Sequence, residues 1–386
     1  MRNTIFRVAT SLALCVGLAL GAAPGYSQDA DDLQVTAGKK KHRKRQNRPI
    51  KLGTSGSNVE DISGGFCCSG TLGALVEKFG TQYILSNNHV LARSNSGKQG
   101  EAIIQPGYGD QSCPASDEAF DTVAQLTAKK RVKFGFDRSN KVDAAIAEVV
   151  PGTVKTDGEI LRIGIPGTTP AAAFVGMEVK KSGRTTGLTR GIVVAVHATG
   201  IVPEFPLDCA GEETKTARFV NQIFIASAND KAFQGPGDSG SMVYQDVDEC
   251  PAPVGLLFAG TDEIGVASPA ATVLKKVKRL KPRGDARFVG CETSELEVTT
   301  ARAPLLREQR VREAAGVMRD WEDDLLRTRG VQGVGIGMTL SGPAEPAIYV
   351  FATDSREEVR QRLPEHLGEF RIEVIETDRF EAYCGP

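Results

Sequence analysis

The sequence has few aromatic residues and almost no net charge. Phenylalanine, tyrosine and tryptophan make up 6% of the 386 residues, and 47 lysines and arginines balance 48 aspartates and glutamates. The formal net charge of −1 therefore selects no class of partner. A chain that is 40% apolar and 25% charged is globular, which excludes a wholly disordered, collagen-like or multi-span membrane protein. At about 100–200 residues per domain, the length predicts two domains.

An apolar run near the amino terminus is too short to span a bilayer comfortably. It extends from Val8 to Ala23 and follows two arginines. Small residues after it suit cleavage following Ser27, with Ala22 and Ala23 as alternative positions. We therefore predict a signal peptide over residues 1–27, a secreted or periplasmic protein, and no membrane span in the mature chain.

The cysteine content favours disulfide bonds and gives no sign of a metal site. Cys15 lies inside the apolar run, and the other seven cysteines predict disulfides in an oxidising compartment, with at least one thiol free or paired between molecules. Cys67 and Cys68 are adjacent, so on a strand they would face opposite sides and have different partners. No pair has zinc-ligand spacing with a nearby histidine, so no metal is expected. The remaining cysteines lie at positions 113, 209, 250, 291 and 384.

A basic segment, residues 28–61, follows the signal peptide. Its core, residues 39–48, holds lysines and arginines without an acid among them. Such a run predicts a disordered leader or propeptide, with a nucleic-acid-binding arm as the alternative. Because no aromatic residues interleave the charges, as stacking on bases would require, we favour the leader and expect no nucleic-acid partner.

Strand-length apolar runs fill the sequence from about residue 65 to residue 280. An early set includes TQYILS and DAAIAEVV, and a second set, after residues 164–170, includes GIVVAVHATG, VNQIFIA and PVGLLFAG. Runs of this length, split by glycine, asparagine and aspartate, indicate two β units. The one convincing helix before residue 300 begins with Ser268 as its N-cap and Pro269 in its first turn.

The character of the sequence changes toward the carboxyl terminus. Residues 304–328 are charged and carry apolar residues at helical intervals, which predicts an amphipathic helix. Strand-like runs follow at 331–338 and 346–352, then a short helix from Asp354 and the strand RIEVIE. Residues 300–386 are therefore predicted to form a small α+β domain, for which a docking, regulatory or inhibitory role is a hypothesis.

The segment GPGDSGS, Gly235–Ser241, is the strongest sign of chemistry. It lies between two apolar runs and presents Ser239 at a strand connection. Serine is a weak nucleophile at neutral pH and needs a base, together with donors for the oxyanion. Without a side chain, Gly237 can turn its amide inward beside that of Ser239, so that both hold one developing negative oxygen. A glycine-rich hairpin without a catalytic role is the alternative.

His89 and Asp143 are candidates for the base and its partner. His89, one of four histidines, follows the apolar strand TQYILS upstream of the serine, in the context of a general base. Asp143 enters the run DAAIAEVV, and a hydrogen bond from the imidazole would let it fix the tautomer and stabilise the imidazolium. The alternatives are a structural histidine and an aspartate that caps a turn.

The order His89, Asp143, Ser239 and the sequence motifs around these residues resemble those of the chymotrypsin-fold serine peptidases. The phrases LSNNHVLA, VDAAIA, KSGRTTGLTRG and GPGDSGSMVY are similar to the bacterial secreted trypsin-like peptidases related to the plant narrow-leaf type proteins. The resemblance implies a mainly β fold, with two Greek-key β-barrels over residues 62–290 followed by the C-terminal α+β domain. It also implies a triad of these three residues, an oxyanion hole of Gly237 and Ser239, and no metal or organic cofactor.

The resemblance also suggests where the substrate side chain binds. In this family the residue six positions before the nucleophile lines the base of the primary specificity pocket, and here it is Phe233, with Gln234 next. Neither is acidic, so cleavage after lysine or arginine is not implied. No obvious activation cut supplies a new amino terminus for Asp238, so other groups are expected to satisfy it. We assign Arg184 a structural role, with a solvated hairpin arginine or a substrate contact as alternatives.

The sequence therefore predicts a secreted serine endopeptidase, a hydrolase that acts on protein or peptide substrates through an acyl-enzyme. The alternatives are a catalytically silent β-barrel adaptor, with a docking partner for its C-terminal domain, and an esterase that uses the same triad. The sequence leaves open the natural substrate, the disulfide connectivity, any need for processing and the oligomeric state.

Overall fold

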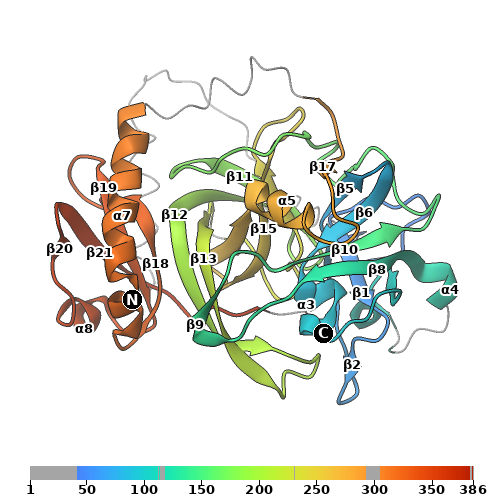
Figure 1. Cartoon of the computed structure of the whole chain (residues 1–386), viewed down its shortest axis with the longest axis horizontal. Helices are drawn as coiled ribbons and strands as arrows, with labels where there is room; N and C mark the ends of the chain where they lie inside the picture. Colours follow the sequence, from blue (N-terminus) through green and yellow to red (C-terminus); the bar gives the residue numbers. More distant parts are fainter. Residues whose placement is uncertain are drawn as a thin grey trace, which may run out of the picture.

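The computed structural model describes residues 41–111, 113, 118–229, 231–292, 305–382 and 385 (Figure 1). The predicted signal peptide and residues 28–40 of the predicted leader lie outside these residues. The fold is mostly β, with two curled sheets and a C-terminal α+β unit, which confirms the predicted fold class.

The first barrel is a curled sheet with the strand order β17–β5–β6–β10–β8–β7–β1–β4 in the described chain. β4 and β5 stand toward opposite ends of this order, yet only Gly73 separates them in the chain, so the sheet closes on itself. Its interior is apolar, with Ile84, Leu85 and Ile146 fully buried. The strands are β1 (Thr54–Asn58), β4 (Gly70–Leu72), β5 (Ala74–Lys78), β6 (Thr81–Ser86), β7 (Ala102–Ile104), β8 (Thr122–Lys130), β10 (Ala144–Val149) and β17 (Arg287–Phe288).

The second barrel closes through a direct pairing of its two longest strands. The strand order is β12–β11–β14–β15–β16–β13, and β12 also pairs with β13, which completes the ring. The helix α5 packs against both barrels, since Val273 and Val277 belong to the core of the first. The elements are β11 (Glu178–Gly183), β12 (Gly187–Pro206), β13 (Thr214–Ser227), β14 (Met242–Gln245), β15 (Pro253–Gly260), β16 (Ile264–Pro269), α5 (Ala270–Val277) and β9 (Gly135–Asn140), which pairs with β13 in parallel.

The helix α5 begins one residue later than predicted and is capped differently. Pro269 occupies the N-cap position without a side-chain hydrogen bond. The hydroxyl of Ser268 instead donates to Gln222 Oε1 at 2.8 Å inside the barrel. At the other end, the buried Lys78 Nζ donates to the carbonyl oxygens of Val277 and Leu280 at 2.8 and 2.9 Å. A cation at this position satisfies carbonyls that the helix leaves without partners.

The C-terminal unit joins the second barrel by continuing its sheet. β18 pairs with β12 in antiparallel register, with Gly200 opposite Gly333, and the pairing continues through β19, β21 and β20. Close packing explains the glycine alternation, because a Cβ on Gly335 would lie 2.9 Å from Ala198 Cβ. α7 packs against β18 and β19. The elements are α7 (Leu305–Arg327), β18 (Val331–Met338), β19 (Pro346–Ala352), α8 (Arg356–Arg360), β20 (His366–Leu367) and β21 (Phe370–Glu376).

The predicted elements of this unit are found, with one correction at α8. The short helix is capped by Ser355 rather than Asp354, since the Ser355 hydroxyl accepts the N–H of Glu358. The shorter elements elsewhere are β2 (Ile62–Ser63), β3 (Phe66–Cys67), α3 (Asn88–Leu91), η1 (Arg93–Asn95), η2 (Tyr108–Asp110) and α4 (Glu118–Asp121). Within the described residues, no helix combines the length and apolar character needed to cross a membrane.

The expectation of a disordered leader does not hold for residues 41–61. His42 is fully buried, with its Nε2 2.9 Å from Ser182 Oγ, and β1 is part of the first barrel. Ile50 and Leu52 form isolated β-bridges and are also buried. The basic residues mislead because buried anchors, His42 and Ile50, lie on either side of them, and because some of them form ion pairs with the barrel, such as Arg45 with Asp121 at 2.6 Å.

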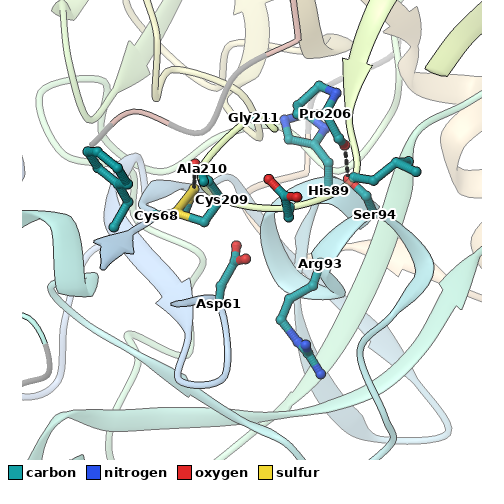
Figure 2. A pocket seen from close by; sticks show the side chains of 12 residues that line it. Asp61, Cys68, His89, Arg93, Ser94, Pro206, Cys209, Ala210 and Gly211 are labelled. Atoms are coloured by element: carbon teal, nitrogen blue, oxygen red, sulfur yellow. Dashed lines mark hydrogen bonds between the residues drawn. A yellow bond between two sulfur atoms is a disulfide. The ribbon is translucent and has the colours of Figure 1, made fainter. Parts of the chain in front are cut away.

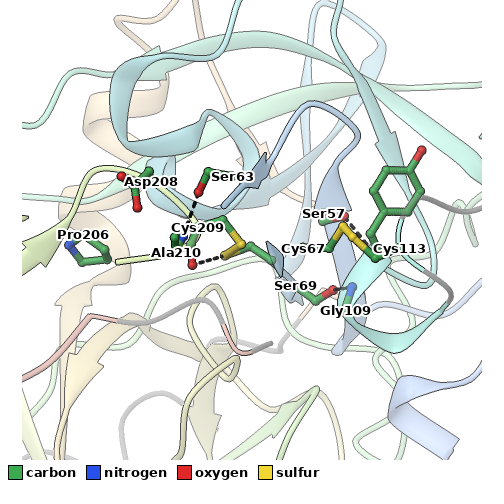
Figure 3. Close-up of a disulfide and its surroundings, with 12 residues drawn as sticks. Ser57, Ser63, Cys67, Ser69, Gly109, Cys113, Pro206, Asp208, Cys209 and Ala210 are labelled. Atoms are coloured by element: carbon green, nitrogen blue, oxygen red, sulfur yellow. Dashed lines mark hydrogen bonds between the residues drawn. A yellow bond between two sulfur atoms is a disulfide. The ribbon is translucent and has the colours of Figure 1, made fainter. Parts of the chain in front are cut away.

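Three disulfides link the described cysteines. Cys67 pairs with Cys113 (Figure 3) and Cys68 with Cys209, which confirms that the adjacent cysteines have different partners. The third bond joins Cys250 to Cys291. The Cys68–Cys209 bond joins the first barrel to the segment after β12. Of the seven cysteines after the apolar run, the one left over by these bonds is at position 384, outside the described residues.

Candidate active site

Neighbouring strands of the first barrel bring His89 and Asp143 together. His89 lies in α3, just after β6, and Asp143 directly precedes β10, which pairs with β6. His89 Nδ1 is 2.5 Å from Asp143 Oδ2, and both side chains are buried. The second carboxylate oxygen accepts the N–H of Asn88 at 2.7 Å. A carboxylate at Nδ1 fixes the orientation of the ring and makes Nε2 the basic nitrogen of the neutral imidazole.

Ser239 lies in a turn that the first barrel contacts closely. Its hydroxyl donates to Phe258 O at 3.2 Å, and its carbonyl oxygen accepts the N–H of Thr71 at 2.8 Å. A Cβ on Gly73 would lie 1.9 Å from Gly240 O, so only glycine permits this approach. The turn is therefore held between β15 of the second barrel and β4 of the first.

The peptide groups around Gly237 and Ser239 have a defined direction. Pro236 O accepts the hydroxyl of Thr185 at 2.5 Å, so the N–H of Gly237, on the opposite side of a trans peptide, points away from Thr185. Asp238 O accepts the N–H of Ser241 at 3.0 Å, so the N–H of Ser239 likewise points away from Ser241. Gly237 has a φ of +94°, which glycine adopts without strain.

One residue of this turn, Asp238, belongs to a buried ion pair. Asp238 and Lys181 are both fully buried, with Lys181 Nζ 3.0 Å from Asp238 Oδ2. Asp238 also accepts the hydroxyl of Thr186 at 2.6 Å and the N–H of Thr185 at 2.8 Å. Burial alone would raise the pKa of Asp238, but the Lys181 ammonium and these hydrogen bonds outweigh it and hold the pKa below its ordinary value. Asp238 is therefore satisfied by groups other than a new amino terminus, as expected.

Arg184 is buried under the same turn. Its guanidinium makes two hydrogen bonds with the carboxylate of Asp110, at 2.5 and 2.9 Å. A Cβ on Gly237 would lie 2.5 Å from Arg184 Nη1, so the arginine directly underlies the turn. The alternative of a solvated hairpin arginine is wrong, and the buried bidentate pair agrees with a structural role.

A cavity of about 400 Å³ lies beside Ser239. Gln234 lines it and donates to Thr261 O at 2.7 Å. Phe233 is not among the lining residues, because its ring is fully buried in the core of the second barrel. Several lining residues were not predicted from the sequence, and no local motif marks those that follow β21. The lining comprises Gln234, Gly235, Pro236, Ser239, Gly260, Thr261, Asp262, Asp378, Arg379 and Glu381.

A second cavity, of about 240 Å³, has His89 in its lining (Figure 2). Asp61 and Arg93 line it, together with the Cys68–Cys209 disulfide. Burial raises the pKa of Asp61 to about 7, against the attraction of Arg93 and His89. The sulfur atoms near Asp61 are disulfide-bonded and are not thiolates, so this cluster does not have the ligands of a metal site.

Replacing Asp61 with asparagine should change the pH dependence of stability. A carboxyl with a raised pKa stabilises the fold fully below its unfolded pKa, and this contribution is lost as the pH rises toward 7. The wild type should therefore lose up to about 4 kcal/mol between pH 4 and 8 relative to Asp61→Asn. Urea unfolding across this range measures the difference, and Glu60→Gln, an exposed neighbour, is the control. Parallel curves for wild type and Asp61→Asn would contradict the assignment.

Residues 132–273 match the family described as the Nal1 C-terminal domain, a stretch that includes Asp143 and Ser239 but not His89. No curated protein is a significant match to the chain.

Among solved structures, the chain resembles bacterial serine proteases at low sequence identity. A glutamic acid specific serine protease is 18% identical, with a TM-score of 0.39 over 62% of this chain and 100% of that one. Chymotrypsin from Cellulomonas bogoriensis is 15% identical, with a TM-score of 0.38 over 63% of this chain and 99% of that one. Protease A from Thermobifida fusca is 14% identical, with a TM-score of 0.39 over the same shares.

Proposed function

We propose that this chain is a secreted serine endopeptidase that uses His89, Asp143 and Ser239 as a catalytic triad. The buried 2.5 Å contact between His89 and Asp143 carries the proposal, because a carboxylate at Nδ1 is what a general base requires. The serine turn, supported by a buried ion pair and pressed against the first barrel, gives a nucleophile its fixed position. The three disulfides favour an extracellular or periplasmic site of action.

The reaction would begin when the Ser239 hydroxyl leaves Phe258 O and turns toward His89 Nε2. Nε2 accepts the proton as Oγ attacks the peptide carbonyl carbon, and Asp143 stabilises the imidazolium. The amides of Gly237 and Ser239 would hold the oxyanion. The imidazolium then protonates the leaving amine, and a water molecule, activated by the same base, hydrolyses the acyl-enzyme. These steps require no metal or organic cofactor.

Gln234 and Thr261 form an uncharged part of the cavity wall, which favours an uncharged substrate side chain at that position. The rest of the lining includes charged residues, among them Asp262, so the preference depends on the substrate side chain lying against Gln234 and Thr261. A peptide library digested by the protein, with new termini identified by mass spectrometry, measures it. Cleavage confined to ester substrates would instead indicate an esterase, and no turnover in any variant would indicate a binding scaffold.

Replacing Asp143 with asparagine should lower kcat/KM for a cleaved peptide about 10⁴-fold. The asparagine amide would donate to His89 Nδ1, so that Nε2 would carry the proton and could not act as a base. Hydrolysis of a fluorogenic peptide measures the effect, and Asp285→Asn, at a fully exposed carboxylate, is the control. A rate within tenfold of the wild type would contradict the role of Asp143.

A further inference from the structure

The segment after β21 leaves the C-terminal unit and returns to the two barrels (Figure 1). Phe380 anchors its start, since its buried ring lies 5.2 Å from the ring of Phe224 and 6.3 Å from that of Phe351, measured between centroids. The N–H of Phe380 donates to Gln332 Oε1 at 2.8 Å. The C-terminal unit therefore fixes the position from which the segment enters the barrels.

Beyond this anchor, the segment makes two reciprocal pairs of backbone hydrogen bonds with the barrels. The N–H of Glu381 donates to Gly260 O, and the N–H of Gly260 donates to Glu381 O, both at 2.9 Å. The N–H of Gly385 donates to Ser69 O at 2.9 Å, and the N–H of Ser69 donates to Gly385 O at 3.0 Å. Both contacts are antiparallel β-bridges. The segment thus binds by strand addition, the mode by which many proteins hold extended peptides.

These two bridges lie on either side of Ser239. Phe258, whose carbonyl accepts the Ser239 hydroxyl, precedes Gly260 by two residues. Thr71, whose N–H binds the carbonyl of Ser239, follows Ser69 by two residues. A peptide whose carbonyl lay at Ser239 would run along the same two backbone edges.

The segment also occupies space beside the nucleophile candidate. Asp378, Arg379 and Glu381 line the cavity that contains Ser239, and Ala382 is fully buried. A Cβ on Gly385 would lie 2.8 Å from Pro236 O. The absence of a side chain therefore allows the segment to lie directly against the serine turn. A substrate and this segment could not pair with Gly260 at the same time.

We propose that the C-terminal segment containing Glu381, Ala382 and Gly385 is an intramolecular peptide ligand of the active-site groove. The full chain is therefore self-blocked, and a substrate must displace the segment before it can pair with Gly260. The consequence for turnover rests on the proposed function, whereas the binding of the segment rests on the four backbone hydrogen bonds and their place around Ser239.

Two single substitutions in the full chain release the segment at its two bridges. Glu381→Pro removes the N–H that donates to Gly260 O, and Glu381→Ala is the matched control that keeps it. Gly385→Leu places a side chain against Pro236 O and Arg184 Nη1, the latter held by its buried ion pair. All three substitutions leave Phe380 and the strands of the C-terminal unit unchanged.

Amide hydrogen exchange reports occupancy without any need for catalysis. In an inactive Ser239→Ala background, the Gly260 amide should exchange at least about tenfold faster in Glu381→Pro than in Glu381→Ala, because a tethered ligand at millimolar effective concentration is bound most of the time. The Ser69 amide should exchange faster in Gly385→Leu than in the same Ser239→Ala chain with Gly385 unchanged. Equal exchange at Gly260 in the proline and alanine variants would overturn the proposal.

The rate of labelling by a fluorophosphonate probe then measures the block in chains that keep Ser239. Glu381→Pro should be labelled at least about tenfold faster than Glu381→Ala. If the Gly260 amide exchanges faster in Glu381→Pro than in Glu381→Ala but the two chains that keep Ser239 are labelled at equal rates, the self-block is overturned. Faster exchange with no labelling in any variant would support the bound segment and overturn the proposed function instead, so the two failures are distinguishable.

Discussion

Replacing Ser239 with alanine is expected to lower kcat for peptide hydrolysis by about 10⁵–10⁶-fold, because it removes the hydroxyl that forms the acyl-enzyme. The residual rate would come from the oxyanion donors and substrate binding alone. The fold should remain intact. The hydroxyl makes one hydrogen bond, to Phe258 O at 3.2 Å, and the backbone contact with Thr71 is unaffected. The free energy of unfolding should therefore change by no more than about 1 kcal/mol.

Ser268→Ala is the matched control for this experiment. Ser268, like Ser239, is buried and donates one hydrogen bond, to Gln222 Oε1. Both variants should unfold at similar urea concentrations, whereas only Ser239→Ala should lose turnover. Steady-state hydrolysis of a fluorogenic peptide provides the comparison. Turnover in Ser239→Ala within a hundredfold of the wild type would contradict the assignment of the nucleophile.

Replacing Lys181 with methionine should destabilise the protein by about 3–5 kcal/mol, because it leaves the carboxylate of Asp238 buried without its cation. The hydrogen bonds from Thr186 and Thr185 remain, but neither donor carries a charge. Because Asp238 precedes the nucleophile candidate directly, turnover should fall as well. Urea denaturation at pH 7 measures the loss of stability.

The pH dependence and a double variant separate this cause from lost packing. Because the pKa of Asp238 lies below its ordinary value, its contribution to stability is present above the unfolded pKa and is lost as the pH falls through the folded pKa. In Lys181→Met the pKa of Asp238 should rise, so the variant should be least impaired in acid. Adding Asp238→Asn should recover part of the lost stability. A double variant no more stable than Lys181→Met would contradict the account.

The sequence predicts the parts of the molecule that depend on local patterns. Short apolar runs split by glycine indicated two β units, the resemblance to chymotrypsin-fold peptidases implied that these units are barrels, and helical periodicity indicated α7. The apolar runs also place His89 just after β6 and Asp143 just before β10, although they do not show that these two strands pair. These features are local because the residues that define them lie within one or two elements.

The features that the sequence does not predict depend on contacts between distant segments. Phe233 was aligned with the specificity pocket, but an apolar ring is more stable in the barrel core, where it is fully buried. Ile50 and Leu52 form β-bridges that make a basic segment part of the fold, although the charges around them suggest disorder. The pairing of Glu381 with Gly260 involves only backbone atoms, so no side-chain motif marks it.

The most direct test of the central claim is to treat the purified protein and its Glu381→Pro variant with a fluorophosphonate probe and to locate the modified residue by mass spectrometry. The account predicts modification of Ser239 alone in both chains, with faster modification in Glu381→Pro, since an activated serine beside a histidine reacts where ordinary serines do not. Modification of neither chain at Ser239, with both chains folded, would contradict it.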